Sequence, residues 1–166
     1  MIFWHTFLES IKLPQKKAMF TLNRTGMDIA VVYMFILLFI VSIPSLIDRI
    51  NSLHTLSVDV ELFFLFIYFF MFYYLPLTII VFILLSIIAA IAVGLAKLMK
   101  RKLRFSILWK MAAYTTTVPF IIYTMFALIF SIDDVFLWFS LLYTLIALIK
   151  MISVYPKRRI KIDQKK

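Results

Sequence analysis

Residues 62–96 read LFFLFIYFFMFYYLPLTIIVFILLSIIAAIAVGLA, a run of 35 residues without a charged side chain. As a helix this run would be about 52 Å long, well beyond the roughly 30 Å hydrocarbon core of a bilayer. Pro76 divides it into an aromatic part, with nine Phe or Tyr residues at 63–74, and an aliphatic part. Backbone groups inside lipid must bond to one another, so the run predicts membrane-embedded helix.

The excess length of this run allows more than one arrangement. Two full spans do not fit, because 62–75 is short for a crossing and the basic residues after 96 would then lie outside. We expect one long helix, tilted or kinked at Pro76, with its aromatic start in the outer interface. A re-entrant segment over 62–75 is the alternative.

The rest of the chain repeats this pattern and places it outside the soluble classes. Apolar residues make up 64% of the 166 residues and charged residues only 16%, against about 45–50% and about 25% in soluble domains. The absence of Cys excludes a disulfide scaffold and a Cys-ligated metal site. Together with the long run, three further apolar segments predict an all-α protein with four transmembrane helices, over about 29–47, 62–96, 111–130 and 135–153.

The charges predict which side each end faces. Blocks at 1–28, 97–110 and 150–166 hold 17 of the 18 basic residues, whereas 48–61 and 131–134 hold five of the eight acids. Short basic loops stay in the cytoplasm, so four spans place both termini and the 97–110 loop inside. We therefore expect a single membrane domain, 1–166, that ends in a basic cytoplasmic tail at 154–166.

The N-terminal segment, 1–24, has an apolar periodicity of its own. Phe3, Trp4, Phe7, Leu8 and Ile11 recur at helical spacing before Pro14. This spacing predicts an interfacial amphipathic helix on the cytoplasmic leaflet. A helix packed against the bundle is the alternative. After this segment, Thr25 and Asp28 resemble a capping box before the first span.

The apolar runs lack the residues that catalysis or ion coupling inside a membrane requires. The charge-free parts of the four spans, 29–47, 62–96, 111–130 and 135–149, contain no Asp, Glu, Lys, Arg or His, and the fourth span reaches full length only if Lys150 extends to the interface. His5 and His54 are predicted on opposite sides of the membrane. Ser42, Ser86 and Ser140 have no His or Lys partner in their spans. We expect neither an enzyme nor a cofactor or metal site.

Two milder polar features remain inside the spans. Small residues at every fourth position form a helix-packing stripe, interpreted as packing within the chain, with dimerisation as the alternative. The most polar stretch would satisfy carbonyls freed by a proline kink or line a small polar cavity. The stripe consists of Ser86, Ala90 and Gly94, and the candidate cavity or kink of Pro76, Tyr114, Thr115, Thr116, Thr117 and Pro119.

The basic loop is the candidate binding surface. It contains no folded nucleic-acid module, so lipid explains its charge better than nucleic acid does. We expect partners to be the bilayer, its anionic headgroups and another membrane protein, but no nucleic acid. The candidate cytoplasmic lipid or partner face comprises Lys97, Lys100, Arg101, Lys102, Arg104, Trp109 and Lys110.

Several of these residues carry a family resemblance. The first half has Phe7-x-x-Ser10, Pro14-x-Lys16-x-Ala18-x-Phe20, Arg24-x-Gly26 and Ser42-Ile43-Pro44; the second has Gly94-Leu95-Ala96-Lys97-Leu98, Lys100-Arg101-Lys102, Leu108-Trp109-Lys110-Met111-x-Ala113-Tyr114 and Pro119. These motifs resemble the DUF 1189 family (domain of unknown function) of Firmicute membrane proteins. Some members are labelled as maltodextrin-utilisation proteins, and the family is distantly Yip1-like.

The resemblance covers most of the chain but not the outer loop. The 48–61 connection is shorter than the extracytoplasmic segment usual in that family. The resemblance implies a bacterial cytoplasmic membrane and a polytopic fold, but no reaction or ligand. The leading hypothesis is a non-enzymatic membrane protein that binds or regulates other membrane components. A small transporter or lipid-handling protein, with a cavity near Thr115–Thr117, Pro119 and the Pro76 kink, is the alternative.

Overall fold

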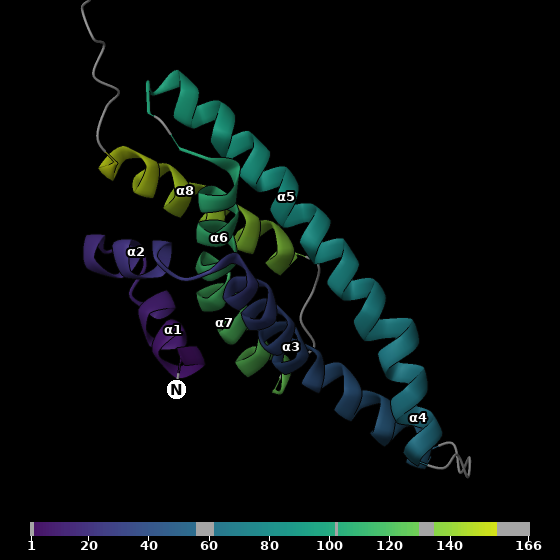
Figure 1. Ribbon diagram of the computed structural model, residues 1–166. Helices are drawn as coiled ribbons and strands as arrows, with labels where there is room; N and C mark the ends of the chain where they lie inside the picture. Colours follow the sequence, from purple (N-terminus) through teal and green to yellow (C-terminus); the bar gives the residue numbers. More distant parts are fainter. Residues whose placement is uncertain (1, 56–61, 102, 130–134, 156–166) are drawn as a thin grey trace, which may run out of the picture.

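The described part of the chain is built from helices. The structure is a computed structural model that describes residues 2–55, 62–101, 103–129 and 135–155 (Figure 1). Every regular element in these ranges is helical. In chain order they are α1 (Ile2–Ile11), α2 (Lys16–Asn23), α3 (Met27–Thr55), α4 (Leu62–Phe69), the π-helix η1 (Phe70–Tyr74), α5 (Leu75–Leu98), α6 (Phe105–Thr115), α7 (Thr117–Ala127) and α8 (Val135–Val154).

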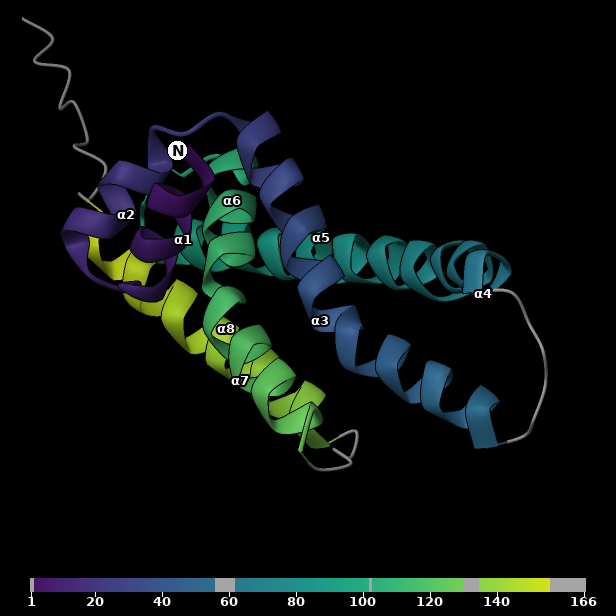
Figure 2. The same cartoon turned by 90° about the horizontal axis from the view of Figure 1, so that it is seen from below.

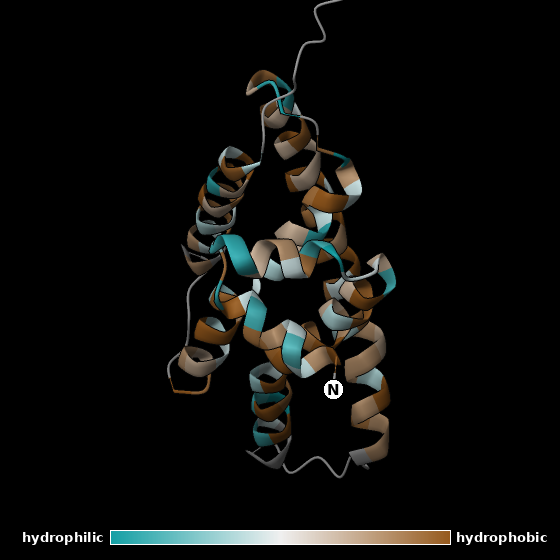
Figure 3. Cartoon of the chain, turned by 60° about the vertical axis from the view of Figure 1, so that its left-hand side comes forward, coloured by the Kyte–Doolittle hydropathy of each residue, from teal (hydrophilic) through white to brown (hydrophobic). Residues whose placement is uncertain are grey.

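Three helical stretches are long and apolar enough to cross a membrane: Met27–Ser52, Phe63–Leu98 and Phe105–Ala127. They correspond to the first three predicted spans, which confirms that the described residues are helical and include three stretches able to cross a membrane. The fourth predicted span falls on α8, whose described apolar stretch, Trp138–Val154, is shorter. Figure 3 shows hydrophilic turns on the two short helices beside the N-terminus, while the long helices are mostly hydrophobic.

The long apolar run forms one unbroken helix made of α4, η1 and α5. Its irregularity lies at residues 70–74, just before Pro76, where the turn widens and the Leu75 N–H bonds to the Phe70 carbonyl. Proline has no N–H to donate, and its ring needs room beside the preceding turn, which a wider π-turn provides. The prediction of one long helix is confirmed. A re-entrant segment would reverse the chain here, and this helix does not.

The α6–α7 span lies at the centre of the fold. Every residue from Leu108 to Thr117 is buried. Figure 2 shows α6 with α1 and α2 on one side and α3 on the other, and both α5 and α8 also pack against α6. The predicted start of this span at 111 was too late, because the helix already begins at Phe105.

Basic side chains gather at one end of the molecule. The ends of α5 and α8 and the start of α6 lie toward the same end as α2, whereas the end of α3 and the start of α4 lie at the opposite end (Figure 1). Cations on this basic end are exposed at Lys16, Lys17, Arg24, Lys97, Lys100, Arg104 and Lys150.

The N-terminal helix turns its polar face inward. Thr6 and Ser10 are buried where α1 packs against α6 and α7, while Trp4, Leu8 and Ile11 are exposed. This contact agrees with the alternative of a helix packed against the bundle. An apolar helix face gains nothing by leaving lipid, whereas hydroxyl groups gain by packing against other polar groups. The polar face is therefore the one that α1 buries.

The predicted packing stripe on α5 packs within the chain only at Ser86, which contacts Trp109 of α6, and the prediction is wrong for Ala90 and Gly94. Ala90 and Gly94 are exposed, and a Cβ added at Gly94 would meet no atom within 4 Å. The helix instead packs against α6 and α8 through another small-residue face, which contains Ala89, Ala92 and Ala96. Both faces have small residues at helical spacing, so spacing alone did not distinguish them.

Candidate functional site

Lys110 lies inside the bundle rather than on the exposed basic loop. Its side chain is only 7% exposed, and its Nζ donates hydrogen bonds to the carbonyl oxygens of Asn23, at 2.9 Å, and Thr25, at 2.7 Å. These carbonyls lie where α2 ends and the chain turns toward α3. The carbonyls at a helix end have no partners within the helix, and a cation there satisfies them. The predicted headgroup-binding role of Lys110 is therefore wrong.

Tyr114 holds the same turn one helical turn along α6. The Thr25 hydroxyl donates its hydrogen to the Leu22 carbonyl at 2.7 Å, so the Tyr114 hydroxyl, 2.8 Å from Thr25 Oγ1, is the donor in that pair. Lys110 and Tyr114 are four residues apart and share one face of α6. Thr25 thus closes α2 and does not form a capping box with Asp28, and α3 begins only at Met27.

A second polar pair continues the cluster toward α1. The hydroxyls of Tyr33 on α3 and Thr117 on α7 are 2.8 Å apart, and the Tyr33 ring meets the Tyr114 ring edge-on at 5.5 Å. The side chain of Ser10 on α1 also interacts with Tyr33. We call these groups, from Lys110 and Thr25 through Tyr114, Tyr33 and Thr117 to Ser10, the polar cluster. It connects α1, α3, α6, α7 and the α2–α3 turn.

Two further threonines of the predicted polar stretch bond within their own helix. Thr115 Oγ1 donates to the Met111 carbonyl and Thr116 Oγ1 to the Ala113 carbonyl, each at 2.7 Å. Neither acceptor is the Thr115 carbonyl that Pro119 leaves without an N–H donor. These hydroxyls bond to the backbone of their own helix, and Pro76 is exposed on the long helix.

The polar cluster consists of one lysine and hydrogen-bonded hydroxyl groups. Apart from Lys110 its side-chain groups are neutral hydroxyls, and each bonds to a carbonyl or to another hydroxyl. In the ranges that the structure describes, no three His, Cys, Asp or Glu side chains come together as metal ligands would. Hydrogen-bonded clusters of this kind fix helices relative to one another.

The candidate basic face is smaller than predicted. Trp109 is only 4% exposed, and its Nε1 donates to Ser86 Oγ at 3.2 Å, so it belongs to the α5–α6 contact. Arg101 is half-buried, and Lys102 lies outside the described residues. The exposed members of the predicted face are Lys97, Lys100 and Arg104.

A long apolar groove lies between α3 and the long helix. One part, of about 740 Å³, extends along the aromatic half beside Phe35, and another, of about 620 Å³, extends from Phe35 to Ala90. The two share Phe35, Thr78 and Ile79 and so form one surface. We call it the α3/α5 groove. Sequence reasoning missed it, because a groove between helices depends on their separation and leaves no local pattern.

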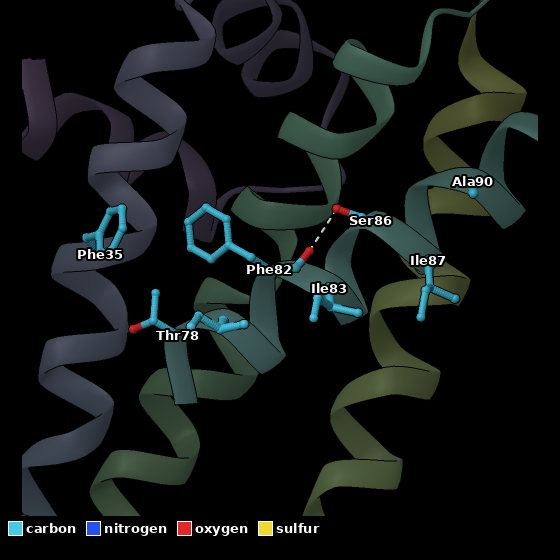
Figure 4. A pocket seen from close by; sticks show the side chains of 8 residues that line it. Phe35, Thr78, Phe82, Ile83, Ser86, Ile87 and Ala90 are labelled. Atoms are coloured by element: carbon cyan, nitrogen blue, oxygen red, sulfur yellow. Dashed lines mark hydrogen bonds between the residues drawn. The ribbon is translucent and has the colours of Figure 1, made fainter. Parts of the chain in front are cut away.

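Aromatic contacts set the width of the α3/α5 groove. The Tyr74 hydroxyl donates to the Phe35 carbonyl at 2.8 Å, and the Phe39 ring stacks on the Phe70 ring at 5.8 Å. Nearer the basic end, Phe35 and Phe82 face each other with ring centroids 5.4 Å apart. Figure 4 shows that beyond this pair only α5 continues the wall, through Ile83, Ser86, Ile87 and Ala90.

Comparisons with known proteins add no assignment. No family, curated protein or solved structure matches this chain.

Proposed function

We propose that the chain is an integral protein of a bacterial cytoplasmic membrane that crosses four times and keeps both termini inside. Three apolar helical stretches and the gathering of cations at one end support this topology. In this arrangement α8 is the fourth span, with Lys150 near its basic end. The same proposal includes membership of the DUF 1189 family, on the basis of the motifs that resemble it.

The topology predicts that the two ends of the bundle label from opposite sides. The chain has no Cys, so the variants Thr55→Cys and Arg104→Cys each carry a single thiol. In intact cells, a membrane-impermeant maleimide should label position 55 directly and position 104 only after the membrane is opened. Labelling of both positions from the same side would contradict four spans.

We propose further that the protein is not an enzyme and that it binds or regulates another membrane component. The observation that carries this proposal is the α3/α5 groove, an apolar surface open at the side of the bundle and bounded by two of the spanning helices. Ligand sites are concave, mostly apolar and carry a few polar groups. The Tyr74–Phe35 hydrogen bond and the Phe35–Phe82 ring contact hold α3 beside the long helix, so the groove is part of the fold.

The exposed cations extend this surface to the cytoplasmic side. Lys97 and Lys100 lie at the end of α5 and Arg104 lies just before α6. Each basic residue near a membrane surface contributes about 1 kcal/mol of attraction to anionic lipid. The same charges would attract an acidic segment of a partner protein.

Photo-crosslinking in native membranes tests the binding role. A p-benzoylphenylalanine at position 83 lies in the α3/α5 groove, and one at position 146 replaces a similarly exposed isoleucine on α8. We expect position 83 to give one recurrent adduct mass and position 146 a spread of bulk-lipid adducts. Matching adduct distributions at the two positions would contradict selective binding in the groove.

A further inference from the structure

The cytoplasmic half of the α3/α5 groove is a hollow strip on one face of α5. Ser86 and Ala90 line it, and Gly94 extends the same face by one turn. Ala90 is exposed, and the space beyond Gly94 is open to at least 4 Å from a Cβ placed there. Larger isoleucine side chains border this strip at Ile83 and Ile87. Beyond Phe82 the strip is a shallow apolar surface formed by α5 alone and open at the side of the helix (Figure 4).

A lysine stands at the cytoplasmic end of this strip. Lys97 follows Ala90 by seven residues, so the two side chains project within about 20° of each other around the helix. Lys97 is exposed in the last turn of α5. In the segment between α5 and α6, the Nε atom of Arg101 is buried and has no hydrogen-bond partner. Among the described residues, the lysine that forms an ion pair is Lys12, which pairs with Glu9. Lys97 has no carboxylate partner among them.

The length of the strip matches one leaflet. Eleven residues of helix separate Lys97 from Ser86, which corresponds to about 16 Å along the axis. One leaflet of the hydrocarbon core is about 15 Å deep. A phosphate held at Lys97 would therefore place the end of its acyl chain near Ser86, beside the buried Trp109.

Building on the binding role proposed for the groove, we propose that this strip binds an anionic phospholipid. One acyl chain lies over Ser86, Ala90 and Gly94, and the phosphate bonds to the Lys97 ammonium. Charge decides between this occupant and a second protein helix. The end of the strip is cationic, and a second copy of this chain in the same orientation would place its own Lys97 against this one.

Tryptophan fluorescence tests the proposal, because the Trp109 Nε1 donates a hydrogen bond to Ser86, which lines the strip. The chain has three Trp residues, and the other two, Trp4 and Trp138, are highly exposed. The variant Trp4→Phe/Trp138→Phe therefore reports on Trp109 alone. It is reconstituted in two sets of phosphatidylcholine vesicles. One set contains brominated phosphatidylglycerol, and the other contains the same fraction of brominated phosphatidylcholine. In both lipids the bromine lies in the lower half of the acyl chain.

We expect brominated phosphatidylglycerol to quench Trp109 more strongly than brominated phosphatidylcholine does. In this background, Lys97→Gln should lower the preference for phosphatidylglycerol about five-fold, the factor that one lysine contributes near an anionic surface. Lys150→Gln removes an exposed lysine on α8, outside the strip, and should lower the preference at Trp109 much less. Ala90→Leu fills the strip and should reduce quenching by both lipids, whereas Ala90→Ser should not.

Three outcomes would overturn the proposal in distinguishable ways. Equal quenching by the two brominated lipids would remove the headgroup preference but leave a lipid-binding groove, so the proposed function would stand. An equal loss of preference in Lys97→Gln and Lys150→Gln would show that surface charge, not this site, attracts the lipid. No quenching by either lipid, with a protein-sized adduct at position 83, would place a partner helix in the groove instead.

Discussion

Lys110→Met should lower the free energy of unfolding by about 3 kcal/mol. Methionine keeps the length and apolar stem of the lysine but removes the donor for the Asn23 and Thr25 carbonyls. Hydrogen bonds to a charged group contribute about 1.5–3 kcal/mol, although those inside membranes average less, near 0.6 kcal/mol. Two such bonds are lost together, and the end of α2 is left with unsatisfied carbonyls. We therefore expect a loss of stability near the upper end of the range of about 1.5–3 kcal/mol.

The matched control is Lys150→Met, which makes the same chemical change at an exposed lysine on α8. It should change the free energy of unfolding by no more than about 0.5 kcal/mol. Both variants can be followed by circular dichroism while sodium dodecyl sulfate is titrated into mixed micelles. A loss for Lys110→Met no larger than that for Lys150→Met would mean that the ammonium does not hold the turn.

Lys110 also shows what the sequence could not predict. The all-helical class and the three long apolar stretches follow from local composition, because backbone in lipid must bond to itself wherever side chains are apolar. The partner of Lys110 is not local: its acceptor at Thr25 lies 85 residues away along the chain. A lysine beside a basic block therefore resembles its neighbours in sequence, although the fold buries it.

The hydrogen-bond partners of the threonines at 115–117 also could not be predicted in full from the local sequence. The sequence predicted that these hydroxyls would satisfy carbonyls freed by the Pro119 kink, but Thr115 and Thr116 bond instead to the Met111 and Ala113 carbonyls of their own preceding turn. It did not indicate that Thr117 instead bonds to Tyr33 on another helix. Which hydroxyl bonds locally and which bonds across helices depends on the break between α6 and α7.

Leucine substitutions on the two alanine-containing faces of α5 should differ strongly in their effect on stability. Ala89 and Ala90 are neighbours in the chain, but their side chains face different environments. Ala89 is 0% exposed in the contact of α5 with the bundle, whereas Ala90 is exposed in the α3/α5 groove. Ala89→Leu should lower the free energy of unfolding by about 3 kcal/mol, because added methylenes in a close-packed contact force helices apart. Ala90→Leu should change it by no more than about 0.5 kcal/mol.

The same detergent titration compares these two variants, with Ile91→Leu as a control for leucine on a neighbouring exposed position. The sign of the difference identifies the face of α5 that packs. If Ala90→Leu were the more destabilising, the stripe of Ser86, Ala90 and Gly94 would be buried in the folded state, and a second helix would have to cover it. If Ala89→Leu is the more destabilising, the stripe remains open to the bilayer, as lipid binding beside Lys97 requires.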